Sequence, residues 1–210
     1  MPLEIWLIYV ATVLALMSTP GPSHLLMLSN SGAHGFGKSV ATAAGDLTAN
    51  FLQMLAAGLG LAALITTSGM ALSVVKWAGV AYLIWLGVRM IRNAKAGGET
   101  DKAASSSASL RGLWLQGFIT SAANPKAVVF FAALFPQFIS AELAFWPQFI
   151  VLSATYILMD GAFLMAYGLG ASWIAKRFKG SARLWIERAG GGFMIAAALL
   201  LSTKSIVQRT

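Results

Sequence analysis

The sequence predicts an all-α polytopic membrane protein with about six transmembrane helices in two inverted three-helix repeats. Hydrophobic residues make up 58% of its 210 residues and charged residues only 10%, whereas soluble domains carry about 25% charged residues. A chain of this composition lacks the polar surface to cover a soluble core, so we expect a lipid bilayer around it. Six long apolar stretches and two proline-containing interruptions, which break the first and fourth helices, predict the same fold class.

Each apolar stretch approaches the roughly 20 residues that a helix needs to cross the hydrocarbon core. The first could instead be a cleaved signal peptide, but the residues before its apolar run hold Glu4 and no Lys or Arg, where a signal peptide carries positive charge. We therefore interpret it as a span. The six predicted spans are 3–28, 40–66, 71–91, 113–138, 143–174 and 184–201.

One polar, low-complexity segment, residues 94–112, divides this single transmembrane domain. It separates a first three-helix repeat (1–93) from a second (113–210). Lys and Arg are enriched in cytoplasmic connections, and eleven of the 15 lie in or beside the connections between spans one and two, three and four, and five and six. This pattern predicts a cytoplasmic linker and both termini outside, although Lys204 and Arg209 in the tail oppose it. The net charge of +8 fits basic membrane loops better than nucleic-acid binding.

Prolines interrupt two spans at matching places. "STPGPSHLLM" (18–27) aligns with "SAANPKAVVF" (121–130), so that Pro22 falls on Pro125. Proline removes a backbone donor and clashes with the carbonyl four residues earlier, and groups freed in lipid need a partner or a wet cavity. Since three spans per half require the second half to enter inverted, these paired breaks predict a transport site near the midplane. The alternative is a simple structural kink.

Asp46, Lys126 and Asp160 lie deep within the predicted spans. A charge at the bilayer centre costs about 3 kcal/mol on insertion scales and usually faces a cavity or a partner. A carboxyl group between apolar surroundings and a nearby lysine could gain and lose a proton during transport. The alternative is an Asp–Lys pair that only fixes packing.

Polar residues also share helical faces with both aspartates. Thr42, Asp46, Asn50 and Gln53 recur at spacings of four, four and three, which places them on one face. In the fifth span, Tyr156 and Tyr167 share a face with Asp160. We expect these faces to line a cavity or to pack on other polar helices.

The two histidines are weaker candidates. His24 follows the Pro-Gly-Pro break and could line the same cavity, whereas His34 lies in "NSGAHGFGKS", which we interpret as an ordinary turn. Neither has the spacing of metal ligands, and the chain has no cysteine. We expect no metal and no cofactor.

Four stretches carry a family resemblance in combination. They are "STPGPSHLLML" (18–28), "AAGDLTANF" (43–51), "KWAGVAYLIWLGVRMIR" (76–92) and "GFITSAANPKAVVFFAALFPQF" (117–138). Together they resemble the lysine exporter and homoserine/threonine resistance family (LysE/RhtB) of bacterial amino-acid efflux proteins, over nearly the whole chain.

The resemblance implies a multi-pass exporter of amino acids or their derivatives in the bacterial inner membrane, driven by the proton gradient. With only two membrane aspartates, we favour neutral substrates such as homoserine, threonine or homoserine lactone. Glycines 190–192 permit close helix contact and make a homodimer possible. By motif and position, the candidate substrate- and ion-binding residues are Pro20, Gly21, Pro22, Gly45, Asp46, Asn50, Asn124, Pro125, Lys126 and Asp160.

Two other classes of function stay open at this point. Two intramembrane aspartates are also typical of an intramembrane aspartyl protease, whose Gly-x-Gly-Asp motif here reads Ala43-Ala44-Gly45-Asp46 and lacks the first glycine. Ser23 beside His24 lacks the Gly-x-Ser-x-Gly context of a serine hydrolase. A channel or a non-transporting membrane interaction protein is the other alternative.

Overall fold

In the computed structural model, the described residues are 1–18, 20–60 and 108–177, with shorter stretches between 77 and 92 and between 188 and 199. The predicted spans 71–91 and 184–201 and most of the predicted linker lie largely outside them. Every element with defined bounds in the described residues is helical. In chain order these are α1 (Leu3–Ser18), α2 (Pro22–His34), α3 (Phe36–Gly58), α7 (Leu110–Ala122), α8 (Pro125–Val129), a π-helical turn η1 (Phe130–Leu134), a 3-10 turn η2 (Phe135–Phe138) and α9 (Phe145–Arg177).

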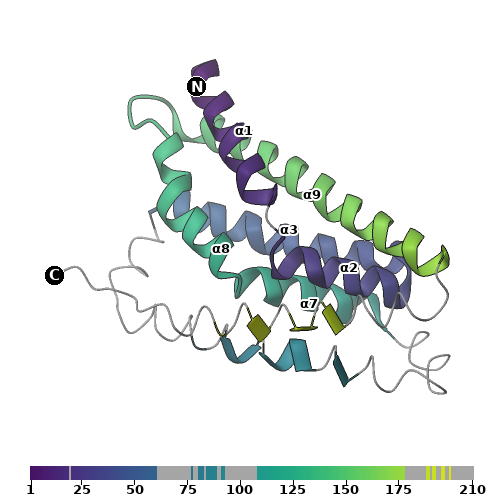
Figure 1. Ribbon diagram of the computed structural model, residues 1–210. Coiled ribbons are helices and arrows are strands. Elements are labelled where there is room, and N and C mark those ends of the chain that lie inside the picture. The colour runs from purple at the N-terminus through teal and green to yellow at the C-terminus, as the bar shows by residue number, and fades with distance from the viewer. Residues whose placement is uncertain are drawn as a thin grey trace.

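The longest helix, α9, has α1 and α2 packed along it one after the other, while α3 and α7 pack together beside it (Figure 1). The Trp6 indole nitrogen in α1 donates a hydrogen bond to Thr155 Oγ1 in α9 at 3.0 Å. Further along, Gly168 of α9 packs against Met27 of α2. The broken first helix therefore follows α9 over most of its length.

Three basic residues, each near the start or the end of a helix, lie at one end of the molecule. Lys38 and Arg111 lie at the starts of α3 and α7, and Arg177 ends α9 at the same end (Figure 1). Glu4 and Glu142 lie at the opposite end, where α1 begins and where the chain enters α9. The enrichment of Lys and Arg at one end is the pattern from which the cytoplasmic side is predicted.

The first predicted break is confirmed between α1 and α2. The two helices meet at an angle of 56°. Proline at position 22 would clash with the carbonyl of Ser18 in a continuous helix, and α1 ends at that residue. Gly21 is the N-cap residue of α2 and Pro22 its first residue, the helical position that proline tolerates because its missing N–H is not needed there.

The second predicted break is also confirmed. Helix α7 ends at Ala122, and α8 begins again at Pro125. Asn124 caps α8, since its side-chain oxygen accepts a hydrogen bond from the Lys126 N–H at 3.1 Å. The π-helical turn η1 and the 3-10 turn η2 follow at once. Both breaks thus share one local form, in which a short gap is followed by proline at the first position of a new helix.

Three predicted boundaries need correction. The second span was expected over 40–66, but α3 covers Phe36–Gly58, because the chain turns at Gly60, whose φ is +76° and suits glycine. The turn expected around His34 is the single residue Gly35, with a φ of +82°, and His34 is the last residue of α2. Helix α7 takes the last residues of the predicted linker, because the Ser109 hydroxyl caps it by accepting from the Gly112 N–H.

Helices α3 and α7 cross with their backbones in direct contact. A Cβ atom built on Gly45 would overlap the carbonyl oxygen of Trp114, and one built on Gly117 would overlap that of Thr42. Only glycine allows this approach at either position, as in other close helix crossings in membranes. The crossing places the polar face of α3 directly against α7.

We expect Gly45→Ala to destabilise the fold by about 1–3 kcal/mol, because the added methyl group must push the two backbones apart. The measurement is the midpoint of thermal unfolding of the purified protein in detergent. Gly37→Ala is the matched control on the same helix, since a Cβ at Gly37 meets nothing within 4 Å. Equal midpoints for the two variants would contradict the close crossing.

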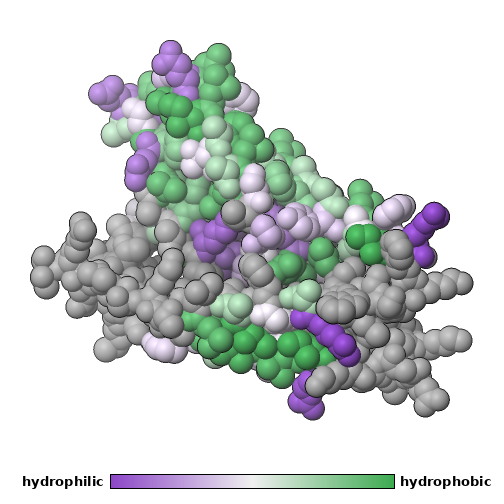
Figure 2. Space-filling model, viewed as in Figure 1, coloured by the Kyte–Doolittle hydropathy of each residue, from purple (hydrophilic) through white to green (hydrophobic). Residues whose placement is uncertain are grey.

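The outer surface agrees with a lipid environment. Figure 2 shows hydrophobic side chains gathered where α1 and the first half of α9 lie, and Leu7, Ile150 and Leu158 are among the exposed apolar residues there. Within the described residues, Phe145–Ile174 of α9 is long and apolar enough to cross a membrane, and the bent pair α1–α2 meets the same test if it is one broken span.

Candidate substrate site

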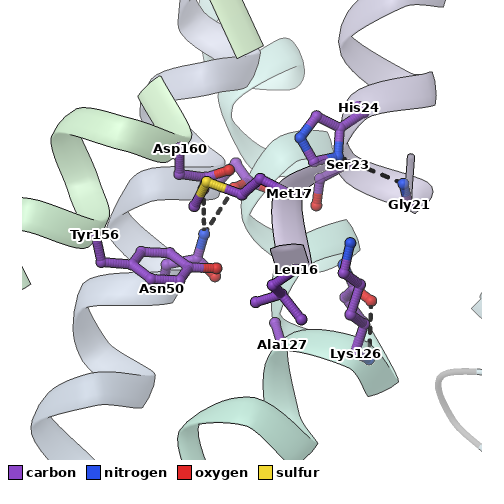
Figure 3. Close-up of a pocket in the computed structure, with 12 residues that line it drawn as sticks. Leu16, Met17, Gly21, Ser23, His24, Asn50, Lys126, Ala127, Tyr156 and Asp160 are labelled. Carbon is purple, nitrogen blue, oxygen red and sulfur yellow. Dashed lines mark hydrogen bonds between the residues drawn. The ribbon is translucent and has the colours of Figure 1, made fainter. Parts of the chain in front are cut away.

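A cavity lies where the two helix breaks meet α3 and α9 (Figure 3). Its lining comes from the end of α1, the start of α2, the middle of α3, the start of α8 and the middle of α9. The lining residues are Leu16, Met17, Gly21, Ser23, His24, Asp46, Asn50, Asn124, Lys126, Ala127, Tyr156 and Asp160.

One side of the cavity carries two carboxylates that share a single amide. Asn50 Nδ2 donates to Asp46 Oδ2 at 2.9 Å and to Asp160 Oδ2 at 2.8 Å. Both aspartates are almost fully buried, with 2% and 4% of their surface exposed. Two adjacent negative charges repel strongly in a low-dielectric interior. A proton or a cation bound between them would relieve that repulsion.

The bridging amide is itself held in place by α7. Ser121 Oγ donates to Asn50 Oδ1 at 2.8 Å, and Gln53 Nε2 donates to the Ser121 carbonyl at 3.1 Å. The close crossing at Gly45 and Gly117 makes these contacts between α3 and α7 possible. Asn50 therefore uses both its oxygen and its NH₂ group, and its orientation is fixed.

The two helix breaks face each other across the cavity. A Cβ on Gly21 would lie 3.8 Å from Asn124 Nδ2 and 3.8 Å from Lys126 Cδ, so the start of α2 and the start of α8 lie close together. Figure 3 shows Lys126 extending from α8 toward Ser23 and His24 at the start of α2. The N–H groups of the first turn of α2 and the Lys126 ammonium thus form a positive region beside the carboxylate pair.

Apolar and aromatic side chains complete the cavity wall. Met17 and Ala127 are buried and line it together with Leu16. Tyr156 lines it too, and its ring stacks on Phe130 with centroids 5.6 Å apart. That contact joins the cavity to a buried aromatic cluster formed by Tyr9, Phe130, Phe131, Phe135, Phe149 and Tyr156. This cluster fills the molecule on the side where α1 begins.

Polar atoms are left over in the cavity lining. Asp46 Oδ1, Ser23 Oγ and His24 Nε2 are buried, and none has a hydrogen-bond partner among the described residues. Unsatisfied buried polar atoms are uncommon in folded proteins, and a bound ligand or water is one way to satisfy them. A dipolar ligand with donors at one end and acceptors at the other could satisfy all three.

Six of the ten candidate residues line this one cavity, namely Gly21, Asp46, Asn50, Asn124, Lys126 and Asp160. Gly45 instead forms the crossing with α7, and Pro22 and Pro125 open helices α2 and α8. Pro20 lies in the gap between α1 and α2. Candidates from both halves of the chain therefore lie around one cavity. The others shape the helix ends or the helix crossing and have no side chain in the cavity.

The candidate set did not include several lining residues. Tyr156 precedes Asp160 by one helical turn, so helical spacing could have added it. His24 and Ser23 lie in the first turn after the Pro-Gly-Pro break, and position alone pointed to the same cavity. Leu16, Met17 and Ala127 carry no polar signal that separates them from lipid-facing residues. Within the described part of the chain, no group of three or more His, Asp or Glu side chains could hold a metal ion.

Residues 14–205 match the sequence profile of the LysE type translocators. The chain belongs to this family. Family membership confirms the predicted resemblance, and it shows a membrane transporter and not an enzyme, which removes the protease alternative.

This translocator is similar to several named proteins over most of its length. It is 35% identical to a homoserine/homoserine lactone efflux protein of Salmonella typhimurium, with 97% of this chain and 99% of that protein covered. It is 30% identical to a leucine efflux protein of an Enterobacter species, with 76% and 80% covered. It is 28% identical to a membrane protein of Vibrio cholerae, with 97% and 98% covered. No solved structure matches this translocator.

Proposed function

We propose that this translocator exports small neutral amino acids, with homoserine, threonine and homoserine lactone favoured, from the bacterial cytoplasm in exchange for protons. The observation that carries the proposal is the pairing of opposite charges across one buried cavity, with Asp46 and Asp160 on one side and Lys126 and the start of α2 on the other. A zwitterionic amino acid such as homoserine or threonine presents the same pair of charges, whereas homoserine lactone presents an ammonium group and an uncharged ester carbonyl. The similarity to homoserine and leucine efflux proteins supports an uncharged substrate side chain.

In the proposed binding mode, the substrate ammonium lies between Asp46 and Asp160. It donates to Asp46 Oδ1, the oxygen that has no partner among the described residues. The substrate carboxylate lies against Lys126 and the free N–H groups at the start of α2, where the helix dipole favours negative charge. These contacts replace the water that the amino acid loses on entering the cavity.

Proton coupling follows from competition for the same two carboxylates. Without substrate, a proton on one aspartate relieves the repulsion between them. When the ammonium arrives, it supplies the positive charge and the proton leaves. One proton is therefore exchanged for one amino acid at a shared site, and the two cannot move in the same direction in one step.

The orientation is proposed from the charge distribution. We propose that the end with Lys38, Arg111 and Arg177 lies on the cytoplasmic side of the inner membrane, and that both chain termini lie on the opposite side. The aromatic cluster then closes the periplasmic side. On the cytoplasmic side, Asn30 Nδ2 donates to Thr42 Oγ1 at 2.9 Å and to Gln116 Oε1 at 3.3 Å. We propose that this polar layer closes the cavity toward the cytoplasm.

Six spans in two inverted repeats would allow one half to rock against the other. A homodimer and the lipid contacts remain predictions.

We expect proteoliposomes with an acidic lumen and an alkaline outside to accumulate labelled homoserine, since protons leaving the lumen drive the amino acid in. A protonophore should collapse this accumulation, and liposomes without protein should show none. Threonine, leucine and lysine should be tested in the same assay, with lysine the weakest. Equal uptake with and without the pH gradient would contradict antiport, whereas no exchange of any amino acid would contradict the export function.

A further inference from the structure

His24 is a buried polar residue that contacts neither the ammonium nor the carboxylate of the substrate in the proposed binding mode. Only 5% of its surface is exposed, and it lines the cavity from the first turn of α2. Its ring packs against Tyr167 and Phe163 of α9, with centroids 4.9 Å and 6.4 Å apart. These contacts hold the imidazole in one orientation.

One hydrogen bond of the His24 ring indicates which ring nitrogen carries the proton. The Gly21 backbone N–H donates to His24 Nδ1 at 3.4 Å. A backbone N–H can only donate, so Nδ1 is the acceptor and the proton of the neutral ring is on Nε2. His24 Nε2 is buried and has no hydrogen-bond partner among the described residues. Figure 3 shows Nδ1 turned toward Gly21 and the other nitrogen turned away from it, on the side of Asp160.

This leaves a fixed, unused donor in a cavity that also has an apolar section of wall, formed by Leu16, Met17 and Ala127. Leu16, Met17 and Ala127 contribute no polar side-chain atom to that wall. A substrate that fills the cavity with an apolar side chain would leave the Nε2–H without a partner. A substrate with an oxygen on its side chain would satisfy it, and unsatisfied buried donors are costly.

We propose that His24 Nε2 donates a hydrogen bond to the side-chain oxygen of the substrate and so selects hydroxylated amino acids over apolar ones of the same size. This inference rests on the proposed function, since it assigns a partner to the side chain of the same substrate. It makes His24 a specificity residue, whereas the aspartates and Lys126 bind the groups that all amino acids share.

The test is the preference for homoserine over norvaline, because the two differ only by a hydroxyl in place of a methyl group. Proteoliposomes loaded with unlabelled homoserine take up labelled homoserine in counter-flow, and each amino acid is added outside as a competitor. We expect the wild type to prefer homoserine. His24→Phe keeps the ring contacts with α9 but has no donor, and its preference should fall at least about fivefold. His24→Gln places an N–H group near the position of Nε2 and should retain most of the preference.

Each result of this experiment decides the matter. A lower preference in His24→Phe with norvaline binding retained, and recovery in His24→Gln, supports the proposal. An unchanged preference in His24→Phe overturns it, as does a wild type that does not distinguish the two amino acids. Equal loss of both amino acids in His24→Phe also overturns it, because His24 would then act on the fold or on transport in general. If the wild type exchanges neither amino acid, the proposed function itself fails.

Discussion

Replacing Asp46 by asparagine is expected to abolish the pH-driven accumulation of homoserine in proteoliposomes. The amide keeps the shape of the side chain and can still contact Asn50, but it neither binds a proton nor attracts the substrate ammonium. Removing one partner of a buried charged contact costs about 2–5 kcal/mol, which corresponds to a loss of affinity of about 30-fold or more, since 1.4 kcal/mol is a factor of ten. Asp160→Asn should have an effect of the same kind, because both carboxylates contact the same amide nitrogen.

The matched control is Glu142→Gln, which also neutralises one carboxylate. Glu142 is exposed at the end of the molecule, before α9 begins, so its loss should leave accumulation unchanged. All three variants should be compared at equal amounts of inserted protein. Gradient-driven accumulation that survives in both Asp46→Asn and Asp160→Asn would remove the aspartate pair from the coupling mechanism.

Replacing Lys126 by alanine is expected to abolish export while the protein still inserts into the membrane. Lys126 lines the cavity at the break between α7 and α8, and we propose that it binds the substrate carboxylate. Its loss should weaken homoserine binding by about 2–5 kcal/mol. Lys126→Arg keeps the charge and should retain part of the activity, although arginine presents a different geometry.

A comparison of two ligands tests the assigned role of Lys126 directly. The compound 3-aminopropan-1-ol is homoserine without its carboxylate, so it cannot use Lys126. The wild type should bind homoserine more tightly, and Lys126→Ala should lose most of that preference. Lys38→Ala, at the start of α3, is the control for removing a lysine away from the cavity. Full export by Lys126→Ala, or an undiminished preference for homoserine, would show that Lys126 does not bind the carboxylate.

The positions of the two breaks could be predicted from the sequence because proline acts locally. A ring at position 22 or 125 excludes a continuous helix whatever surrounds it, and both breaks lie where the motifs indicate. The polar face of α3 could also be predicted, since Thr42, Asp46 and Asn50 follow helical spacing and all three are buried. The convergence of Asp46, Lys126 and Asp160 followed from the cost of exposing charge to lipid.

Other features depend on packing between segments that are distant in sequence. Nothing in the spacing of residues indicates that Asn50 joins the two aspartates, because Asp160 lies 110 residues away. The role of Gly45 is another case. As part of a Gly-Asp motif it was a candidate for binding, but its lack of a side chain matters because Trp114 of α7 packs against it. The end of α3 at Gly58 was predicted too late, since an apolar run by itself does not tell where the chain turns.

The central claim is that the substrate ammonium and a proton compete for the Asp46–Asp160 pair. It is tested most directly by adding homoserine to purified protein in a weakly buffered solution and measuring the protons released. The account predicts release of about one proton for each amino acid bound, reduced in Asp46→Asn and Asp160→Asn and unchanged in Glu142→Gln. Binding of homoserine to the wild type without proton release would contradict it.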